Sequence, residues 1–180
     1  MRSFVSGLPS SPPRATHMLA SAIALGVAAG WLAGGQDLRR LGDLRIRFWP
    51  LLAFAVVLRA LAPLFGYLSA VAYVAAFGSI AVAAFADRAL PGMTAIVAGA
   101  TLNWLVVAAN GGMPVDPVAL AAAGVTMPND RLHIELGPAT RLPQLADVIP
   151  LGLFRSVYSV GDVLLAIGGF WLPFAWLRRR

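Results

Sequence analysis

The chain has 180 residues, of which 59% are hydrophobic and 12% are charged, whereas roughly 25% are charged in an ordinary soluble domain. Its mean hydropathy is +0.76 and its formal net charge is +6. A soluble fold of this size cannot bury so much apolar side chain. The composition therefore excludes a soluble enzyme, a disordered chain and a disulfide-stapled secreted domain, and it predicts an integral membrane protein.

The residue types also limit the chemistry and the partners. Cysteine is absent and all fourteen basic residues are arginine, which excludes thiol catalysis, Cys-ligated metals and lysine Schiff bases. The two histidines, His17 and His133, are far apart and form no ligand motif, so we expect neither a metal nor a cofactor. In so apolar a chain we assign the positive charge to cytoplasmic loops and lipid headgroups, and we expect no nucleic-acid partner.

The N-terminal residues 1–17 carry Pro9, Pro12 and Pro13 among small polar residues, a composition that predicts a disordered tail. Met18 stands directly before the first long apolar segment. Translation starting at Met18 is therefore an alternative to a start at Met1.

Five apolar segments follow, each about as long as the ~20 helical residues that cross a bilayer core. Only Arg59 in the second and Asp162 near the start of the fifth interrupt them with charge. The sequence predicts an all-α, single-domain bundle of five transmembrane helices over residues 18–180. The predicted spans are 18–35, 48–65, 67–86, 92–109 and 156–177.

The first span has a second interpretation as a cleaved signal peptide, with a passable cleavage site at 27–29. Four arginines follow this segment and only two precede it, which is the wrong bias for a signal. With five spans, the arginine-richer side holds the loops 36–47 and 87–91 and the C-terminus. The positive-inside rule then predicts an N-terminus outside and a C-terminus in the cytoplasm.

Two connections between spans are long enough to carry structure. Residues 35–47 interleave leucine and isoleucine with arginine, which predicts a short helix at the cytoplasmic interface, either for orientation alone or for anionic lipid. The outer loop 110–155 is the only long connection, and long ordered loops are often functional. Within it we expect a short Ala-rich helix over 117–124, an exposed polar stretch over 126–140 and a segment on the membrane surface over 141–150.

Four polar residues fall at similar depth in the outer half of the predicted bundle: Arg59, Tyr73, Asn103 and Asp162. An intramembrane charge indicates function by default, so these residues form a candidate site for a headgroup, an anion or a proton, with Arg59 and Asp162 as the natural ion pair. The alternatives are a structural pair, or Arg59 reaching the interface alone. Ser159 and Asp162 also match a capping box, which would start the last helix at Ser159.

Gly26, Gly30 and Gly34 recur every four residues along one face of the first span. Such a face permits close helix contact, either within the monomer or between two copies of the chain.

Residues 108–115 read AANGGMPV. This run resembles the ANGGxMPV signature of an uncharacterised family of bacterial membrane proteins, here without the residue between Gly112 and Met113. The resemblance extends to residues 34–47, 145–150 and 159–162. It implies a small inner-membrane protein and no known activity, and it directs attention to an outer-loop motif near the start of the last span. That motif comprises Asn110, Gly111, Gly112, Met113, Pro114 and Asp147, and it is either a structural turn or a binding site.

The sequence thus predicts a multi-pass protein of the bacterial inner membrane that acts as a non-enzymatic accessory or binding subunit. We expect it to contact membrane lipid, a membrane-protein partner or a second copy of itself through its outer loop. The alternative is a small enzyme or transporter that acts on a lipid headgroup or small solute through the polar cluster.

Overall fold

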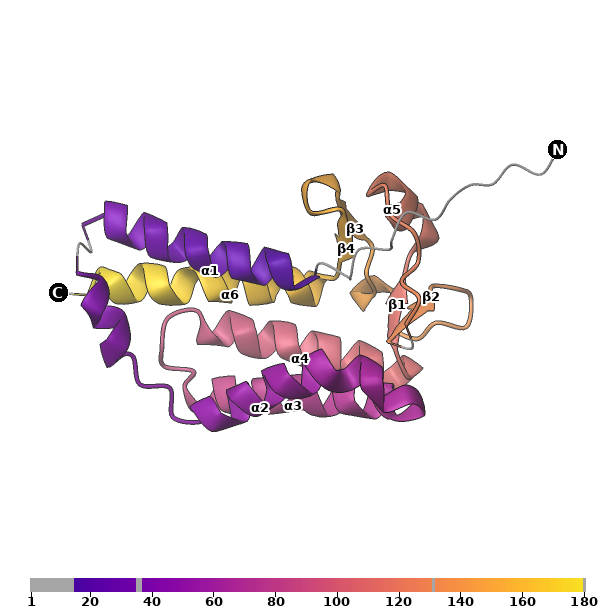
Figure 1. The fold of residues 1–180 in the computed structure, drawn as a ribbon, viewed down its shortest axis with the longest axis horizontal. Coiled ribbons are helices and arrows are strands. Elements are labelled where there is room, and N and C mark those ends of the chain that lie inside the picture. The colour runs from indigo at the N-terminus through magenta and orange to yellow at the C-terminus, as the bar shows by residue number, and fades with distance from the viewer. Residues whose placement is uncertain (1–14, 35–36, 131, 180) are drawn as a thin grey trace.

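The computed structural model describes residues 15–34, 37–130 and 132–179, and it is mostly helical. Most of the predicted tail lies outside these residues. The five longest α-helices of the described residues run along a common direction (Figure 1). They are α1 (Ala15–Leu32), α2 (Trp49–Leu61), α3 (Ser69–Ala86), α4 (Met93–Asn110) and α6 (Val160–Leu177). Helix α1 packs mainly on α6, α6 also on α4, α4 also on α3, and α3 also on α2.

Three helical segments in the described part of the chain are long and apolar enough to span a membrane. They are Leu64–Ala86, Met93–Asn110 and Val160–Leu177. The segments Met18–Leu32 and Trp49–Leu61 are apolar helices of shorter length.

The second predicted span, 48–65, is shorter in the structure because α2 ends at Leu61 and passes into the 3-10 helix η2 (Ala62–Leu68). Gly66 has a φ of 56°, a conformation that only glycine adopts at low cost. The Ser69 hydroxyl donates a hydrogen bond to the Gly66 carbonyl at 2.6 Å. This turn lets the chain reverse into α3.

Glycines let the helices approach one another closely. A Cβ on Gly161 of α6 would overlap the Asn103 side chain of α4, and a Cβ on Gly168 would lie 2.6 Å from the Gly92 carbonyl oxygen. Of the three spaced glycines in the first span, Gly26 and Gly30 lie against the backbone of α6. Gly34 follows the end of α1 with a φ of 107° and nothing near it.

The predicted outer loop folds into a cap at one end of the bundle (Figure 1). We call the seven elements from β1 to β4 the cap: β1 (Met113–Val115), α5 (Pro117–Ala122), β2 (His133–Glu135), η3 (Pro143–Leu145), β3 (Ile149–Leu151), η4 (Gly152–Phe154) and β4 (Ser156–Tyr158). Strand β1 pairs with β2 in parallel, and β3 pairs with β4 antiparallel. A small apolar core that includes Leu120 and Val157 joins α5 to the strands.

The cap corrects two expectations. The chain is not purely α-helical, because four short strands are present. Residues 156–158 belong to β4 rather than to the last helix, which begins at Val160 with Ser159 as its N-cap. The predicted helix 117–124 appears as α5, and the 35–47 segment contains the 3-10 helix η1 (Leu38–Asp43), which contacts α6 at the opposite end of the bundle from the cap.

Candidate polar site beneath the cap

Where α6 begins, three polar side chains form a closed hydrogen-bond network. The Asn103 amide on α4 donates to Asp162 Oδ1 at 2.8 Å, and the Ser159 hydroxyl donates to Asn103 Oδ1 at 2.9 Å. Asp162 Oδ2 accepts the Ser159 backbone N–H at 3.2 Å, while the Ser159 hydroxyl accepts the Asp162 backbone N–H at 3.0 Å. This is the predicted capping box, extended by a buried asparagine that is 1% exposed.

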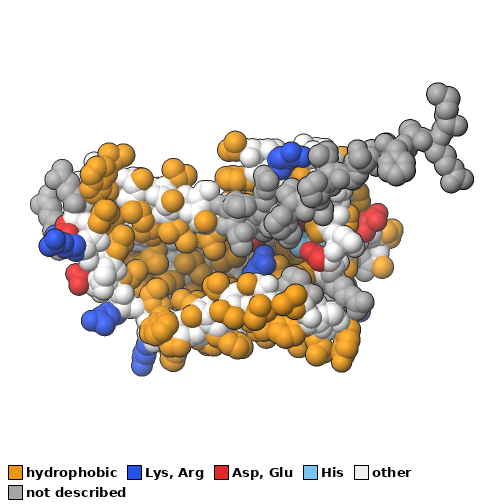
Figure 2. Space-filling view, viewed as in Figure 1, with side chains coloured by type: hydrophobic (Ala, Val, Ile, Leu, Met, Phe, Trp, Pro, Cys, Tyr) orange, Lys and Arg blue, Asp and Glu red, His pale blue; other side chains and the backbone are white. Residues whose placement is uncertain are grey.

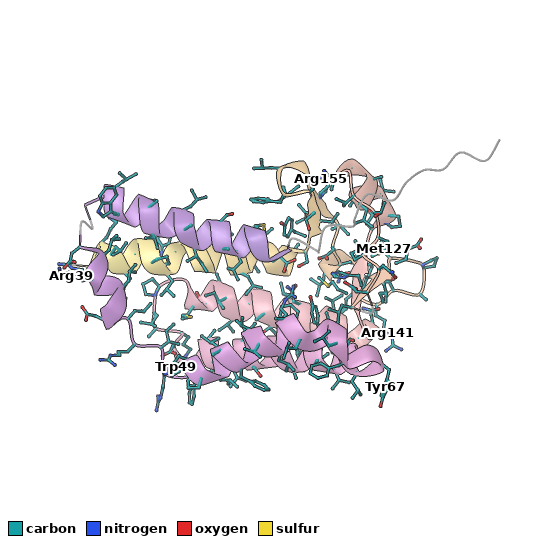
Figure 3. The ribbon with its side chains drawn as sticks, viewed as in Figure 1. Arg39, Trp49, Tyr67, Met127, Arg141 and Arg155 are labelled. Carbon is teal, nitrogen blue, oxygen red and sulfur yellow. The ribbon has the colours of Figure 1, made fainter. Side chains whose placement is uncertain are left out.

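Arg59 lies in the last turn of α2, at the cap end of that helix. Figure 3 labels Trp49 and Tyr67 at the two ends of the α2–η2 segment, with Tyr67 beside the cap. The guanidinium carbon of Arg59 stands 4.7 Å from the ring centroid of the buried Tyr73 on α3. The predicted residues Arg59, Tyr73, Asn103 and Asp162 therefore form two contacting pairs.

The predicted ion pair between Arg59 and Asp162 is not formed. Among the described residues, the ion pair within 4 Å is that of His133 with Asp130, at 2.9 Å. The physical reason is that both oxygens of Asp162 already accept hydrogen bonds from α4 and from its own N-cap, while the Arg59 head stacks on an aromatic face. Two opposite charges thus remain separate, and both side chains are only half-buried.

Asp147 is the most unusual acid of the cap. Its backbone N–H donates to the Pro114 carbonyl at 2.8 Å, and its carbonyl accepts from Asp116 at 3.0 Å, so the segment is held beside β1. Its side chain is 7% exposed, and its Oδ1 has no hydrogen-bond partner among residues 15–34, 37–130 and 132–179. Burial raises the pKa of Asp147 well above its usual range; the negative Asp162 adds to this rise and the positive Arg59 opposes it.

Tyr158 was not among the residues that the sequence indicated. It pairs with Ile149 across β3 and β4, its side chain is fully buried, and its hydroxyl has no hydrogen-bond partner in the described part of the chain. Burial raises the pKa of Tyr158, the nearby Ser156 side chain opposes the rise, and the charges of Asp162 and Asp147 add to it. In the sequence, the feature that could have indicated Tyr158 is its position directly before Ser159, the N-cap of the last helix. Asp147 and Tyr158 therefore extend the polar cluster from the helices into the cap.

The other residues of the outer-loop motif build the junction between bundle and cap. The Asn110 amide donates to the Arg141 carbonyl and accepts from the Arg141 N–H, each at 2.8 Å. Gly111 ends α4 with a φ of 72°. A Cβ on Gly112 would lie 3.1 Å from the Leu132 carbonyl oxygen, while Met113 and Pro114 form β1. These contacts give the motif a structural role.

The face shown in Figure 2 is hollowed between α1 and α2, and the visible floor of the hollow is hydrophobic. A basic side chain lies at the cap end of the hollow, and every basic residue of this chain is an arginine. The hollow follows from the packing order, because α1 packs mainly on α6 and α2 mainly on α3. The described residues contain no group of three metal-ligating side chains.

The fold and the site define a helical protein with helices of membrane-spanning length, a folded cap at one end and a polar cluster beneath that cap. The chain belongs to the DUF5317 family, a family of unknown function, whose model matches residues 42–174. No curated protein and no solved structure matches the chain. The predicted membership in a family of unknown function is thereby confirmed, and the individual motifs stay predictions.

Proposed function

We propose that this protein is a non-enzymatic, lipid-binding subunit of the bacterial inner membrane, with five spans, the cap outside and the C-terminus in the cytoplasm. In this proposal the hollow between α1 and α2 holds an acyl chain, and Arg59 contacts the phosphate of the headgroup. The cap then covers the headgroup, which is the contact through the outer loop that the sequence suggests.

The observation that carries the proposal is the unpaired charge of Arg59. A charged side chain at this depth is costly unless an opposite charge or water meets it. No acidic side chain of the described residues lies within ion-pair distance of Arg59, and the Tyr73 ring faces only one side of a guanidinium. A phosphate supplies the missing negative charge, and guanidinium binds phosphate oxygens through paired hydrogen bonds.

The dimensions of the bundle also fit a lipid. Helix α6 has 18 residues and is about 27 Å long at 1.5 Å per residue, which is close to the ~30 Å hydrocarbon core. An apolar hollow along this length offers an acyl chain the same burial as the surrounding bilayer. In this proposal, Arg59 at the cap end of the hollow then fixes the position of the headgroup.

The test is the affinity of the purified full chain for dioleoylphosphatidylglycerol, measured by native mass spectrometry. We expect Arg59→Gln to weaken binding about tenfold, since charge-assisted hydrogen bonds contribute roughly 1.5–3 kcal/mol. The matched control is Arg88→Gln, because the Arg88 guanidinium stacks on Phe85 at 4.6 Å in the same manner but lies far from the cap. Equal affinities in the two variants would contradict the proposal.

The alternative is an enzyme or transporter that acts on a headgroup through the same cluster. The observation in its favour is the burial of Asp147 and the raised pKa that results from it, because a carboxyl that holds its proton more tightly than usual suits proton transfer. Turnover of an added phospholipid, followed by mass spectrometry, would favour this alternative.

A further inference from the structure

The cluster beneath the cap contains charges of both signs that do not neutralise each other. Arg59 and Asp162 are half-buried and each interacts with a neutral neighbour, Tyr73 for the arginine and Asn103 for the acid. Tyr73 on α3 and Asn103 on α4 belong to helices that pack on each other, and both charges act on Tyr73 and Asp147. The two charges therefore lie in one region beneath the cap and are held apart within it.

The cluster also contains buried polar atoms without a hydrogen-bond partner among the described residues. They are Asp147 Oδ1 and the Tyr158 hydroxyl, although buried polar atoms are nearly always paired in native proteins. Tyr158 directly precedes Ser159, whose backbone N–H donates to Asp162, and the Tyr158 carbonyl accepts a hydrogen bond from Val148, the residue after Asp147. Both groups therefore lie near the acidic side of the site. The side of the site with Asp147, Tyr158 and Asp162 has room for a hydrogen-bond donor. The side with Arg59 has room for an anion.

We propose that the site selects a zwitterionic phospholipid headgroup that carries a phosphate and a primary ammonium, as phosphatidylethanolamine does. The phosphate lies against Arg59, and the ammonium lies between Asp162, Asp147 and Tyr158. This inference rests on the proposed lipid-binding function and names the class of lipid.

The hydrogen-bond chemistry favours a primary ammonium. An ammonium has three N–H donors and meets the vacant acceptors. A quaternary choline group has no donor and leaves them unsatisfied, while a glycerol headgroup brings no positive charge to the acids.

The experiment compares dioleoylphosphatidylethanolamine, dioleoylphosphatidylglycerol and dioleoylphosphatidylcholine on the full chain by native mass spectrometry. We expect the ethanolamine lipid to bind about tenfold more tightly than the other two, the ratio that one charge-assisted hydrogen bond supports. Comparable affinities for all three lipids would overturn the inference. They would leave the proposed function intact, provided that Arg59→Gln weakens binding of all three.

Two variants locate the ammonium. We expect Asp162→Asn to remove most of the preference for the ethanolamine lipid while the affinity for the glycerol lipid changes little. Asp147→Asn keeps the shape of the side chain, and we expect it to reduce the same preference. The control is Asp43→Asn in η1, at the opposite end of the molecule, which leaves the preference unchanged. If Asp162→Asn does not fold, Asp147→Asn decides, and an unchanged preference in that variant overturns the inference.

A last arm separates the lipid from its free headgroup. Soluble phosphoethanolamine at millimolar concentration should compete weakly with the ethanolamine lipid, because it lacks the acyl chains that the hollow would hold. Competition as strong as that of the intact lipid would overturn the assignment of a lipid and identify the free headgroup as the ligand.

Discussion

At the scale of single residues, Asp147 is the least favourably placed group in the cap. Its backbone N–H and carbonyl are both hydrogen-bonded beside β1, which holds the residue in the interior of the cap. Burial with a free oxygen favours the neutral carboxylic acid over the carboxylate. The residue therefore binds its proton more tightly in the folded protein than in the unfolded chain.

This difference predicts a pH dependence of stability. The folded-state pKa of Asp147 is raised, so the stabilisation by protonation is complete below the ordinary pKa of about 4 and is lost as the pH rises through the folded-state value. We expect Asp147→Asn to melt at a temperature that depends less on pH than that of the wild type as the pH rises above about 4. The measurement is the melting temperature in mild detergent, and parallel curves for the two proteins would refute this account.

Asp130 is a control for this prediction, because its pKa is shifted in the opposite direction. Burial by itself would raise its pKa, but hydrogen bonds from His133 and from the backbone hold the pKa of Asp130 below its usual value. Its contribution to stability is present above the ordinary pKa and is lost as the pH falls through the folded value. In melting curves, Asp130→Asn should therefore be less stable than the wild type above the ordinary pKa, and the difference between the two proteins should shrink as the pH falls.

Sequence reasoning found Arg59, Asn103 and Asp162 because a polar side chain stands out in an apolar segment. It placed Asp147 in the motif but could not foresee its burial, and it missed Tyr158. The burial of these two side chains depends on how β3 and β4 fold back onto the helix ends. The pairing of Arg59 with Asp162 was the natural expectation from charge, but the capping box and Asn103 hold the acid instead.

At the scale of elements, the contact between α4 and α6 positions the whole site. Gly161 leaves room for the Asn103 side chain, and Gly99 lies against the Gly161 carbonyl. The two backbones approach so closely that Asn103 reaches both Ser159 and Asp162. A larger residue at this crossing would separate the helices and open the network.

We therefore predict that Gly161→Ala lowers stability by about 1–3 kcal/mol, the usual cost of overpacking a tight contact. The variant should show a lower melting temperature and faster hydrogen exchange at the start of α6. The matched control is Gly137→Ala in the cap, where an added Cβ meets no atom within 4 Å and φ is not in the left-handed region. If Gly161→Ala is as stable as this control, α4 and α6 can move apart without loss of stability, and the prediction is wrong.

The long helices could be predicted from the sequence. In a bilayer, a long apolar segment must satisfy its backbone hydrogen bonds within itself, and a helix does so. The start of α6 was open between Ser156 and Ser159, and the capping box settles it. The strands could not be read, since each has three residues and pairs with a segment distant along the chain or across a tight turn. For β1, the partner β2 begins about twenty residues later, and no local pattern marks that pairing.

At the scale of the whole molecule, the cap and η1 occupy opposite ends of the bundle, and Figure 3 labels Arg155 in the cap and Arg39 at the far end. The proposed orientation places the cap outside the cell. The chain contains no cysteine, so single introduced thiols report the two ends without background labelling.

We predict that Gly137→Cys in the cap reacts with a membrane-impermeant maleimide in intact cells, and that Gly42→Cys in η1 reacts only after permeabilisation. Both glycines are exposed with space for a side chain, so neither change should disturb the fold. The reverse labelling pattern would invert the proposed orientation. Labelling of both positions in intact cells would contradict a bundle that crosses the membrane an odd number of times between them.

The packing of α1 on α6 also determines the order in which the protein can be assembled. Helix α1 ends at Leu32 and its main partner begins at Val160. At about 5–20 residues per second of synthesis, α1 waits on the order of ten seconds before its docking surface emerges. During that interval the face of Gly26 and Gly30 is open to lipid or to an insertion chaperone. A chain truncated before α6 leaves its first helix without its native neighbour, which would expose the nascent protein to membrane proteases.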